Sequence, residues 1–327
     1  MNVHFLSLVT GVALAILPFA ATAETVAYYR FDGTNGRPVT TILDSGPLGL
    51  NGTEVGAAKY SPGVIGTGLD LSGDGNFGSI PHSTNFVMMN DFTVELFFKA
   101  NQPYVVYGSD GSSLINQLHT GFGGNHLSSY SIEMTASGSL NGFVSYALNV
   151  GLDTGLTSPS FADGRWHHMA LVFRHNLLAD INTLQLYVDY ALQTAGSGAA
   201  TPVAWADFPL YLGAGNYLGS DSQYRRNFDG NLDEVRISNV ALLPSQFVTI
   251  PADQFALVQI SNSIGGIQLQ WDSRTNHAYQ AQFTRELPAN PWTNLGGPLS
   301  GKGNPLTLHD AFVPEQTQRF FRVLEAP

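Results

Sequence analysis

The amino-acid sequence predicts an all-β protein with two domains. Aromatic residues make up 11% of the 327 residues and glycine occurs 35 times, whereas only 12% of the residues are charged. This composition supplies β-prone residues and turns, but lacks the Lys- and Glu-rich surfaces of helical proteins. Apart from one helical turn expected after Leu243-Pro244-Ser245, no segment repeats its apolar residues with a helical period. We therefore expect a sandwich of many short strands.

The N-terminal segment is expected to direct export. Residues 5–21 are nearly all apolar or small, and Ala21 and Ala23 occupy the two positions that a signal peptidase reads. The run is shorter than the ~20 residues of a membrane-spanning helix, which makes an uncleaved anchor the weaker alternative. We expect residues 1–23 to be a signal peptide and the mature protein, beginning at Glu24, to be secreted or at the cell surface without a membrane span.

Charge and cysteine content exclude several classes of protein. There are 14 basic and 25 acidic residues, a formal net charge of −11, and an acidic surface repels nucleic acid. The sequence contains no cysteine, which excludes a disulfide scaffold, thiolate zinc sites, iron–sulfur clusters and thiol nucleophiles. An exported protein without cysteine is typical of a bacterial secretory route.

Four segments of the first domain, residues 24–250, show strand patterns. Residues 92–99 alternate cleanly, with four apolar side chains on one face. Similar patterns predict strands over residues 166–174, 183–188 and 232–238.

The strand pattern restarts after a boundary near Pro251, which predicts a second domain over residues 251–327. Strands are expected around residues 267–271, 279–283 and 319–324. The charge also changes at this boundary: residues 1–250 carry 9 basic and 19 acidic residues, and residues 251–327 carry 5 and 6. A domain of this size is marginal alone, so we expect it to dock on the first domain or its linker.

An ordered series of short motifs resembles a laminin G-like jelly-roll domain of the concanavalin A-like lectin/glucanase superfamily. The resemblance covers roughly residues 25–248. One departure is Tyr190, because the family usually has glycine after the Val188-Asp189 pair, so this turn needs another conformation or a left-handed tyrosine. The motifs are Tyr29-Arg30-Phe31-Asp32-Gly33, Asp44-Ser45-Gly46, Leu50-Asn51-Gly52-Thr53, Gly66-Thr67-Gly68-Leu69-Asp70-Leu71-Ser72-Gly73, Phe92-Thr93-Val94-Glu95, Asp163-Gly164-Arg165-Trp166-His167-His168-Met169-Ala170-Leu171-Val172, Leu186-Tyr187-Val188-Asp189, Leu210-Tyr211-Leu212-Gly213 and Phe228-Asp229-Gly230-Asn231-Leu232-Asp233-Glu234-Val235-Arg236-Ile237.

The resemblance implies the expected architecture: a concanavalin A-like jelly-roll sandwich followed by a small β-sandwich-like domain. Residues 255–327 more loosely resemble small C-terminal β domains of large secreted planctomycete and verrucomicrobial proteins. The residues that carry this second resemblance are Leu269-Gln270-Trp271, Tyr279, Trp292-Thr293-Asn294-Leu295 and Arg319-Phe320-Phe321-Arg322-Val323.

Catalytic residues are not expected. The superfamily includes retaining glucanases, which need two carboxyl groups about 5–5.5 Å apart, but no two glutamates lie two or four residues apart in this sequence. A catalytic pair of carboxyl groups contributed by two separate strands remains an alternative. His167 and His168 are neighbours on a strand, so they point to opposite faces and cannot chelate one ion. We expect one to be buried beside Trp166 and the other to be exposed.

Calcium is the expected cofactor. Asp233 has the parity of Val235 and Ile237, which would place its carboxylate on the apolar face, where it needs hydrogen bonds or a cation. Calcium accepts oxygen ligands of this kind. The resemblance implies a structural calcium site at positions like Asp32 and Asp233. The alternative is that Asp233 caps the amides of a loop.

The expected function is that of a non-catalytic recognition module whose partner is a glycan or an extracellular protein. The alternatives are a glycoside hydrolase of the same fold and a purely structural or adhesive surface protein. Arg225-Arg226 could contact an acidic glycan, although a solvated turn is the simpler interpretation. Aromatic residues that could stack on sugars, or that fill the core instead, are Tyr104, Tyr107, Tyr130, Tyr217 and Tyr224.

Overall fold

A computed structural model places most of the chain and shows an almost entirely β protein. The described residues contain two short 3-10 turns, η1 (Thr84–Phe86) and η2 (Pro244–Gln246), and η2 forms where the sequence predicts a helical turn. The predicted signal peptide, the boundary around Pro251, Tyr107, Tyr217, Tyr224 and Arg225 lie outside the described residues. The structure describes residues 25–106, 111–120, 126–147, 150–204, 208–215, 226–250, 259–263, 266–271, 273, 278–285, 292–301, 305–311 and 319–326.

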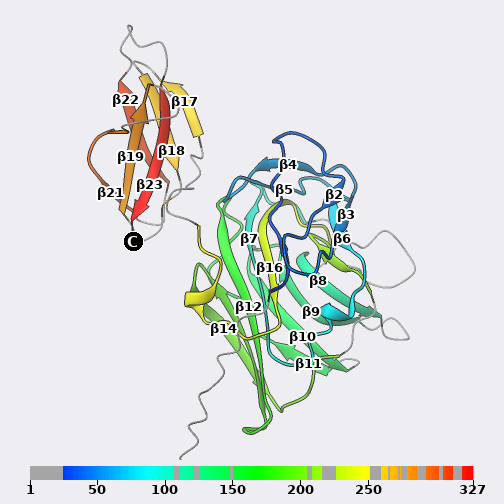
Figure 1. Cartoon of the computed structure of the whole chain (residues 1–327). Coiled ribbons are helices and arrows are strands. Elements are labelled where there is room, and N and C mark those ends of the chain that lie inside the picture. Colours follow the sequence, from blue (N-terminus) through cyan, green and yellow to red (C-terminus); the bar gives the residue numbers. More distant parts are fainter. Residues whose placement is uncertain are drawn as a thin grey trace, which may run out of the picture.

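Sheet A of the first domain has the strand order β14-β13-β12-β7-β16-β5-β4, and β1 also pairs with β16. The first and last strands of the domain, far apart in sequence, thus lie side by side (Figure 1). The strands are β1 (Thr25–Tyr29), β4 (Lys59–Pro62), β5 (Thr67–Asp70), β7 (Phe92–Ala100), β12 (His167–Asn176), β13 (Ile181–Val188), β14 (Ala191–Gly198) and β16 (Gly230–Ser238).

Sheet B is also antiparallel and has the order β11-β10-β9-β8-β15-β6-β3-β2. Its strands are β2 (Thr41–Ile42), β3 (Gly52–Val55), β6 (Phe77–Ile80), β8 (Ser112–Thr120), β9 (His126–Met134), β10 (Leu140–Ala147), β11 (Val150–Asp153) and β15 (Leu210–Leu212).

The inner faces of sheets A and B share one apolar core. Phe92 of β7 lies 5.3 Å, between ring centroids, from both Phe173 of β12 and Tyr130 of β9. Alternate residues of β7 enter this core, which confirms the pattern predicted for residues 92–99. Two antiparallel sheets packed in this way form the jelly-roll sandwich that the sequence resemblance implies.

The β13–β14 hairpin explains the departure at Tyr190. Asp189 and Tyr190 form its two-residue turn with φ angles of 48° and 65°, so the tyrosine adopts the left-handed conformation usual for glycine. The strain is offset by contacts of the side chain: the Tyr190 ring stacks on His168 with centroids 4.6 Å apart, and its hydroxyl donates to the Val248 carbonyl at 3.0 Å.

The C-terminal part forms two further sheets around a small apolar core. Sheet C has the order β17-β18-β22, and in sheet D β19 pairs with β20, β21 and β23. Trp271 of sheet C and Tyr279 of sheet D are fully buried in this core. The strands are β17 (Gln259–Ser263), β18 (Gly266–Trp271), β19 (Ala278–Thr284), β20 (Thr293–Asn294), β21 (Leu299–Ser300), β22 (Leu306–Ala311) and β23 (Phe320–Ala326).

A search of the described residues for membrane-crossing helices finds none of sufficient length and hydrophobicity.

Candidate functional site

Asp233 does not share a face with Val235 and Ile237, so the orientation expected from its parity is wrong. Glu234 and Val235 of β16 lie opposite the single residue Leu96 of β7, and Glu234 has a φ of 50°, which marks a β-bulge. Asp233 pairs with Phe97, on the outer face of sheet A, whereas Val235 and Ile237 enter the inner core. The bulge inserts one residue and therefore reverses the alternation.

The Asp233 carboxylate is nevertheless fully buried, because the turn between β4 and β5 covers it. Oδ2 accepts hydrogen bonds from the amides of Val64 and Ile65, at 2.8 and 3.0 Å, and Oδ1 accepts one from Glu234 at 2.9 Å. Burial raises the pKa of Asp233 well above its usual range, although the amides oppose the shift. Asp233 therefore caps three backbone amides, which is the role given above as the alternative to calcium binding.

Asp32 lies beside the same turn, but its carboxylate forms an ion pair with Arg30. A β-carbon at Gly66 would lie 2.7 Å from Asp32 Oδ1, while Asp32 Oδ2 forms an ion pair with Arg30 at 3.2 Å. Arg30 also lies 3.6 Å from the buried Glu234, which accepts a hydrogen bond from the Tyr28 hydroxyl. Burial, followed by the hydrogen bond to Glu234, raises the pKa of Tyr28.

Calcium at Asp32 and Asp233 stays a prediction. Within the described residues, no group of three or more Asp, Glu or His side chains converges on a point that could hold a metal ion. A calcium ion takes 6–8 oxygen ligands. At these two positions it would draw most of them from backbone carbonyls and water.

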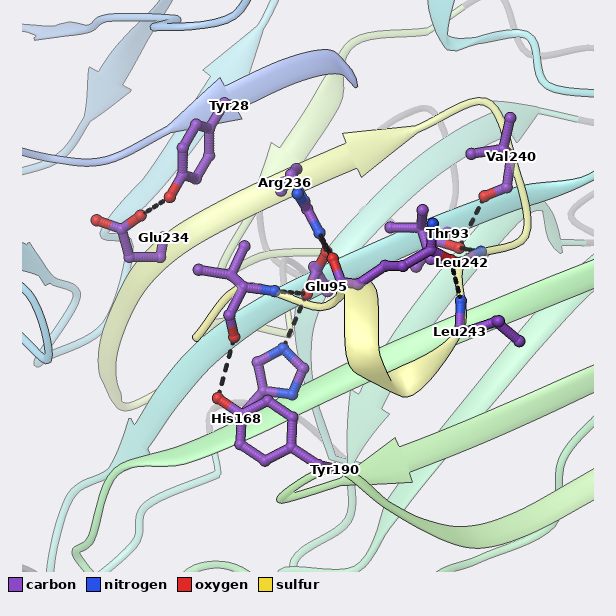
Figure 2. A network of polar contacts seen from close by, with 12 residues as sticks. Tyr28, Thr93, Glu95, His168, Tyr190, Glu234, Arg236, Val240, Leu242 and Leu243 are labelled. Atoms are coloured by element: carbon purple, nitrogen blue, oxygen red, sulfur yellow. Dashed lines mark hydrogen bonds and ion pairs between the residues drawn. The ribbon is translucent and has the colours of Figure 1, made fainter. Parts of the chain in front are cut away.

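A second charged network is built around Glu95 and lies buried on the outer face of sheet A (Figure 2). Its carboxylate accepts hydrogen bonds from His168 Nε2 at 2.9 Å, Arg236 Nε at 2.7 Å and the Val248 amide at 2.8 Å. Asp91 lies four residues before Glu95, but it precedes β7 and accepts a hydrogen bond from the His175 amide at 2.7 Å. The bonds to Glu95 hold a charged group that would otherwise be costly to bury.

This network fastens residues 239–250, here called the covering segment, onto sheet A. Thr93 binds it twice, donating to the Val240 carbonyl and accepting from the Leu242 amide (Figure 2). Leu242 and Phe247 complete an apolar cluster on the same face. The outer face of sheet A around β7 and β12 is therefore covered by the chain itself.

The two adjacent histidines point to opposite faces, as expected, but neither is exposed. His168 packs among Phe97, Tyr190 and Phe247, and the side chain of His167 is only 12% exposed.

The outer face of sheet B carries a row of directly paired residues that crosses all eight strands. Most of them are small and polar, with two aromatic residues among them. In spatial order from β11 to β2 the row is Asp153, Phe143, Ser131, Asn116, Tyr211, Ser79, Thr53 and Thr41. Paired residues point to the same side of a sheet, so these side chains form one continuous line.

The row is buried at its centre and open towards one edge. Asn116 and Ser131 are 1% and 3% exposed, Tyr211 and Ser79 are half-buried, and Thr53 is exposed. We call Tyr211, Ser79, Thr53 and Thr41 the polar strip. Neighbouring strands are about 4.8 Å apart, so the strip extends over roughly 14 Å. The Tyr211 ring is held edge-on against Phe77, with centroids 5.8 Å apart.

The chain on either side of residues 216–225 is anchored at the buried centre of this face. A β-carbon on Gly215 would lie 2.3 Å from Ser113 Oγ, so only glycine allows this close approach. At the other end, the Arg226 carbonyl accepts the Ser113 amide, and the Arg226 side chain forms an ion pair with Glu133 at 2.7 Å. Arg226 is therefore not the freely solvated residue that a simple turn would give.

The aromatic candidates that the structure describes belong to the core. Tyr130 is fully buried, and Tyr104 packs on the core near Phe228. Sequence reasoning instead missed Tyr211 and its row. Ser-rich stretches in which polar and apolar residues alternate, such as residues 128–134, were the available signal, but alternation does not reveal which strands are neighbours.

Comparisons with known proteins agree with this architecture. A family model described as the concanavalin A-like lectin/glucanases superfamily matches residues 71–248, more than half of the chain. No curated protein has a sequence that matches this chain.

Similar solved structures include the binding domain of botulinum neurotoxin DC in complex with SialylT. The TM-score is 0.51 at 12% identity, and the match covers 79% of this chain and 56% of that one. Domain 4 of an extracellular arabinanase from Geobacillus stearothermophilus, in complex with arabinotriose, has a TM-score of 0.45 at 21% identity, covering 68% and 96%. Trypanosoma rangeli sialidase in complex with the inhibitor DANA has a TM-score of 0.45 at 13% identity, covering 67% and 31%. At these identities the likeness concerns the fold alone.

Proposed function

The chain belongs to the concanavalin A-like lectin/glucanases superfamily, and from this premise we propose that it is a secreted, non-catalytic recognition protein that binds carbohydrate along the polar strip of sheet B. One observation carries the proposal. The register pairs Tyr211, Ser79, Thr53 and Thr41 directly across four strands on the outer face of sheet B. Hydroxyl groups exchange hydrogen bonds with sugar hydroxyls, and a tyrosine ring offers an apolar face to a pyranose.

The two sheets differ in a way that favours this location. On the outer face of sheet A, residues 239–250 cover β7 and β12, accept a hydrogen bond from Arg236 and donate one to Glu95. The polar strip presents Tyr211 and Ser79, which are half-buried, and Thr53, which is exposed. A ligand that lies across the strands would contact side chains from β15, β6, β3 and β2 together.

We also propose that the protein does not hydrolyse glycosides. The Glu95 carboxylate, which lies beneath the covering segment, contacts four nitrogen donors of His168, Arg236 and Val248. The Asp233 carboxylate accepts hydrogen bonds from three backbone amides. Neither carboxyl group is placed to donate a proton to a bound sugar. Release of reducing sugars from any polysaccharide that the protein binds, abolished by Glu95→Gln or Asp233→Asn, would overturn this part of the proposal.

The binding proposal is tested with the mature protein, residues 24–327, on a glycan array, followed by titration of the best oligosaccharide. Tyr211→Ala removes the stacking ring and is expected to weaken binding about tenfold or more. Phe143→Ala removes an aromatic residue from the same row, outside the polar strip, and is the matched control. Equal losses in the two variants, or binding unaffected by Tyr211→Ala, would contradict the proposal.

A further inference from the structure

The outer face of sheet D, in the C-terminal part, carries a second cross-strand row. Gln282 of β19 pairs with Asn294 of β20 on one side and with Arg322 of β23 on the other. Ala281 and Val323, their neighbours in sequence, point into the small core. The three polar side chains therefore lie together on the face turned away from that core.

Two hydrogen bonds link these side chains, each donated in the direction from Arg322 through Gln282 to Asn294. Arg322 Nε donates to Gln282 Oε1 at 2.8 Å, and Gln282 Nε2 donates to Asn294 Oδ1 at 2.7 Å. Because an arginine nitrogen can only donate, it determines which end of the glutamine amide accepts, and this in turn orients Asn294. The groups left at the two ends are the terminal nitrogens of Arg322 and the amide nitrogen of Asn294. All of these are hydrogen-bond donors.

The Arg322 side chain also packs on an aromatic ring. Its guanidinium carbon lies 4.4 Å from the ring centroid of Trp292, which is half-buried. Among the described residues no carboxylate pairs with Arg322. Arg319 provides a contrast within the same strand region, because it also stacks on an aromatic ring, Phe283, but forms an ion pair with Asp310.

Charge distribution allows an anion to approach this row. Residues 251–327 contain 5 basic and 6 acidic residues, a net charge of −1, whereas residues 1–250 have a net charge of −10. The C-terminal part therefore repels an acidic ligand far less than the first domain does.

We propose that Arg322, Gln282, Asn294 and Trp292 form a binding site for an acidic polysaccharide. The two terminal nitrogens of Arg322 match the two oxygens of a carboxylate or sulfate group. The exposed part of Trp292 beside this fork suits the apolar face of the sugar ring that carries the group, a feature that an acidic peptide lacks. The site is independent of the polar strip on sheet B.

The test uses the mature full chain, residues 24–327, titrated with polygalacturonate for the carboxylate and with dextran sulfate for the sulfate. Neutral dextran is the uncharged probe and polyaspartate the peptide probe. Arg322→Ala should weaken binding of the preferred acidic polysaccharide by about tenfold or more. Arg285→Ala removes the same charge from an exposed position in the same domain and should change binding less than about threefold.

Gln282→Glu is a second variant that leaves Arg322 in place. A carboxylate at this position would neutralise the guanidinium from its Nε side, so binding should again fall, with the melting temperature retained. Tyr211→Ala should leave this binding unchanged, which separates the proposal from that made for sheet B. Equal losses in Arg322→Ala and Arg285→Ala, absence of binding to both acidic polysaccharides, or equally tight binding of polyaspartate would each overturn it.

Discussion

His167 is expected to make the stability of the protein depend on pH. It lies at the start of β12, between the loop that carries Asp163 and the turn that carries Asp189. Its Nε2 is 3.0 Å from Asp163 Oδ1 and its Nδ1 is 2.8 Å from Asp189 Oδ2. The ring packs edge-on against Phe161, with centroids 5.2 Å apart. The two hydrogen bonds to carboxylates require both ring nitrogens to donate, which is the protonated form.

The size of the effect follows from the pKa. Burial lowers the pKa of His167, but the hydrogen bonds to Asp163 and Asp189 outweigh it and raise the pKa from 6.5 to about 9. A raised histidine pKa stabilises the folded state fully below pH 6.5, and this stabilisation is lost as the pH rises through 9. Each pKa unit corresponds to about 1.4 kcal/mol, so the unfolding free energy should fall by about 3 kcal/mol between pH 6 and pH 9.

Urea denaturation of residues 24–327 at pH 6, 7, 8 and 9 measures this change. His167→Gln is the comparison, because glutamine can hydrogen-bond but carries no titrating charge. The wild type should be about 3 kcal/mol more stable than the variant at pH 6, and nearly equal to it at pH 9. If the difference between the two proteins is the same at every pH, His167 does not act through its charge.

Three further outcomes are expected. If calcium binds at Asp233 and Asp32, the melting temperature should rise with calcium and Asp233→Asn should shrink that rise; superimposable melts in calcium and in chelator would leave Asp233 with its amide-binding role alone. Tyr190→Phe keeps the stack on His168 but loses the hydrogen bond to Val248, which should lower the unfolding free energy by about 1 kcal/mol in urea melts; an unchanged value would show that this bond contributes nothing. Limited proteolysis should cut around residues 251–255, and cleavage inside residues 166–174 instead would count against the domain boundary.

Local patterns in the sequence were enough to predict the fold class and many of the strands. Apolar residues recur at every second position in β7 and β13, and these positions enter the core as expected. Because the alternation of apolar and polar residues is a property of consecutive residues, it can be recognised without knowing which strands are neighbours. The motif series likewise predicted the family, because its members are short segments in a preserved order.

Tertiary structure decided which residues meet. One bulge at Glu234 moved Asp233 to the outer face, and a bulge depends on how two strands pair as well as on the residue that forms it. The polar strip joins β15, β6, β3 and β2, although Tyr211 and Thr41 are 170 residues apart in the chain. Likewise, Arg322 meets Gln282 only because β23 pairs with β19. The physical reason is that strand order and register are set by hydrogen bonds and packing between distant segments, and these contacts are not encoded in the pattern of any one strand.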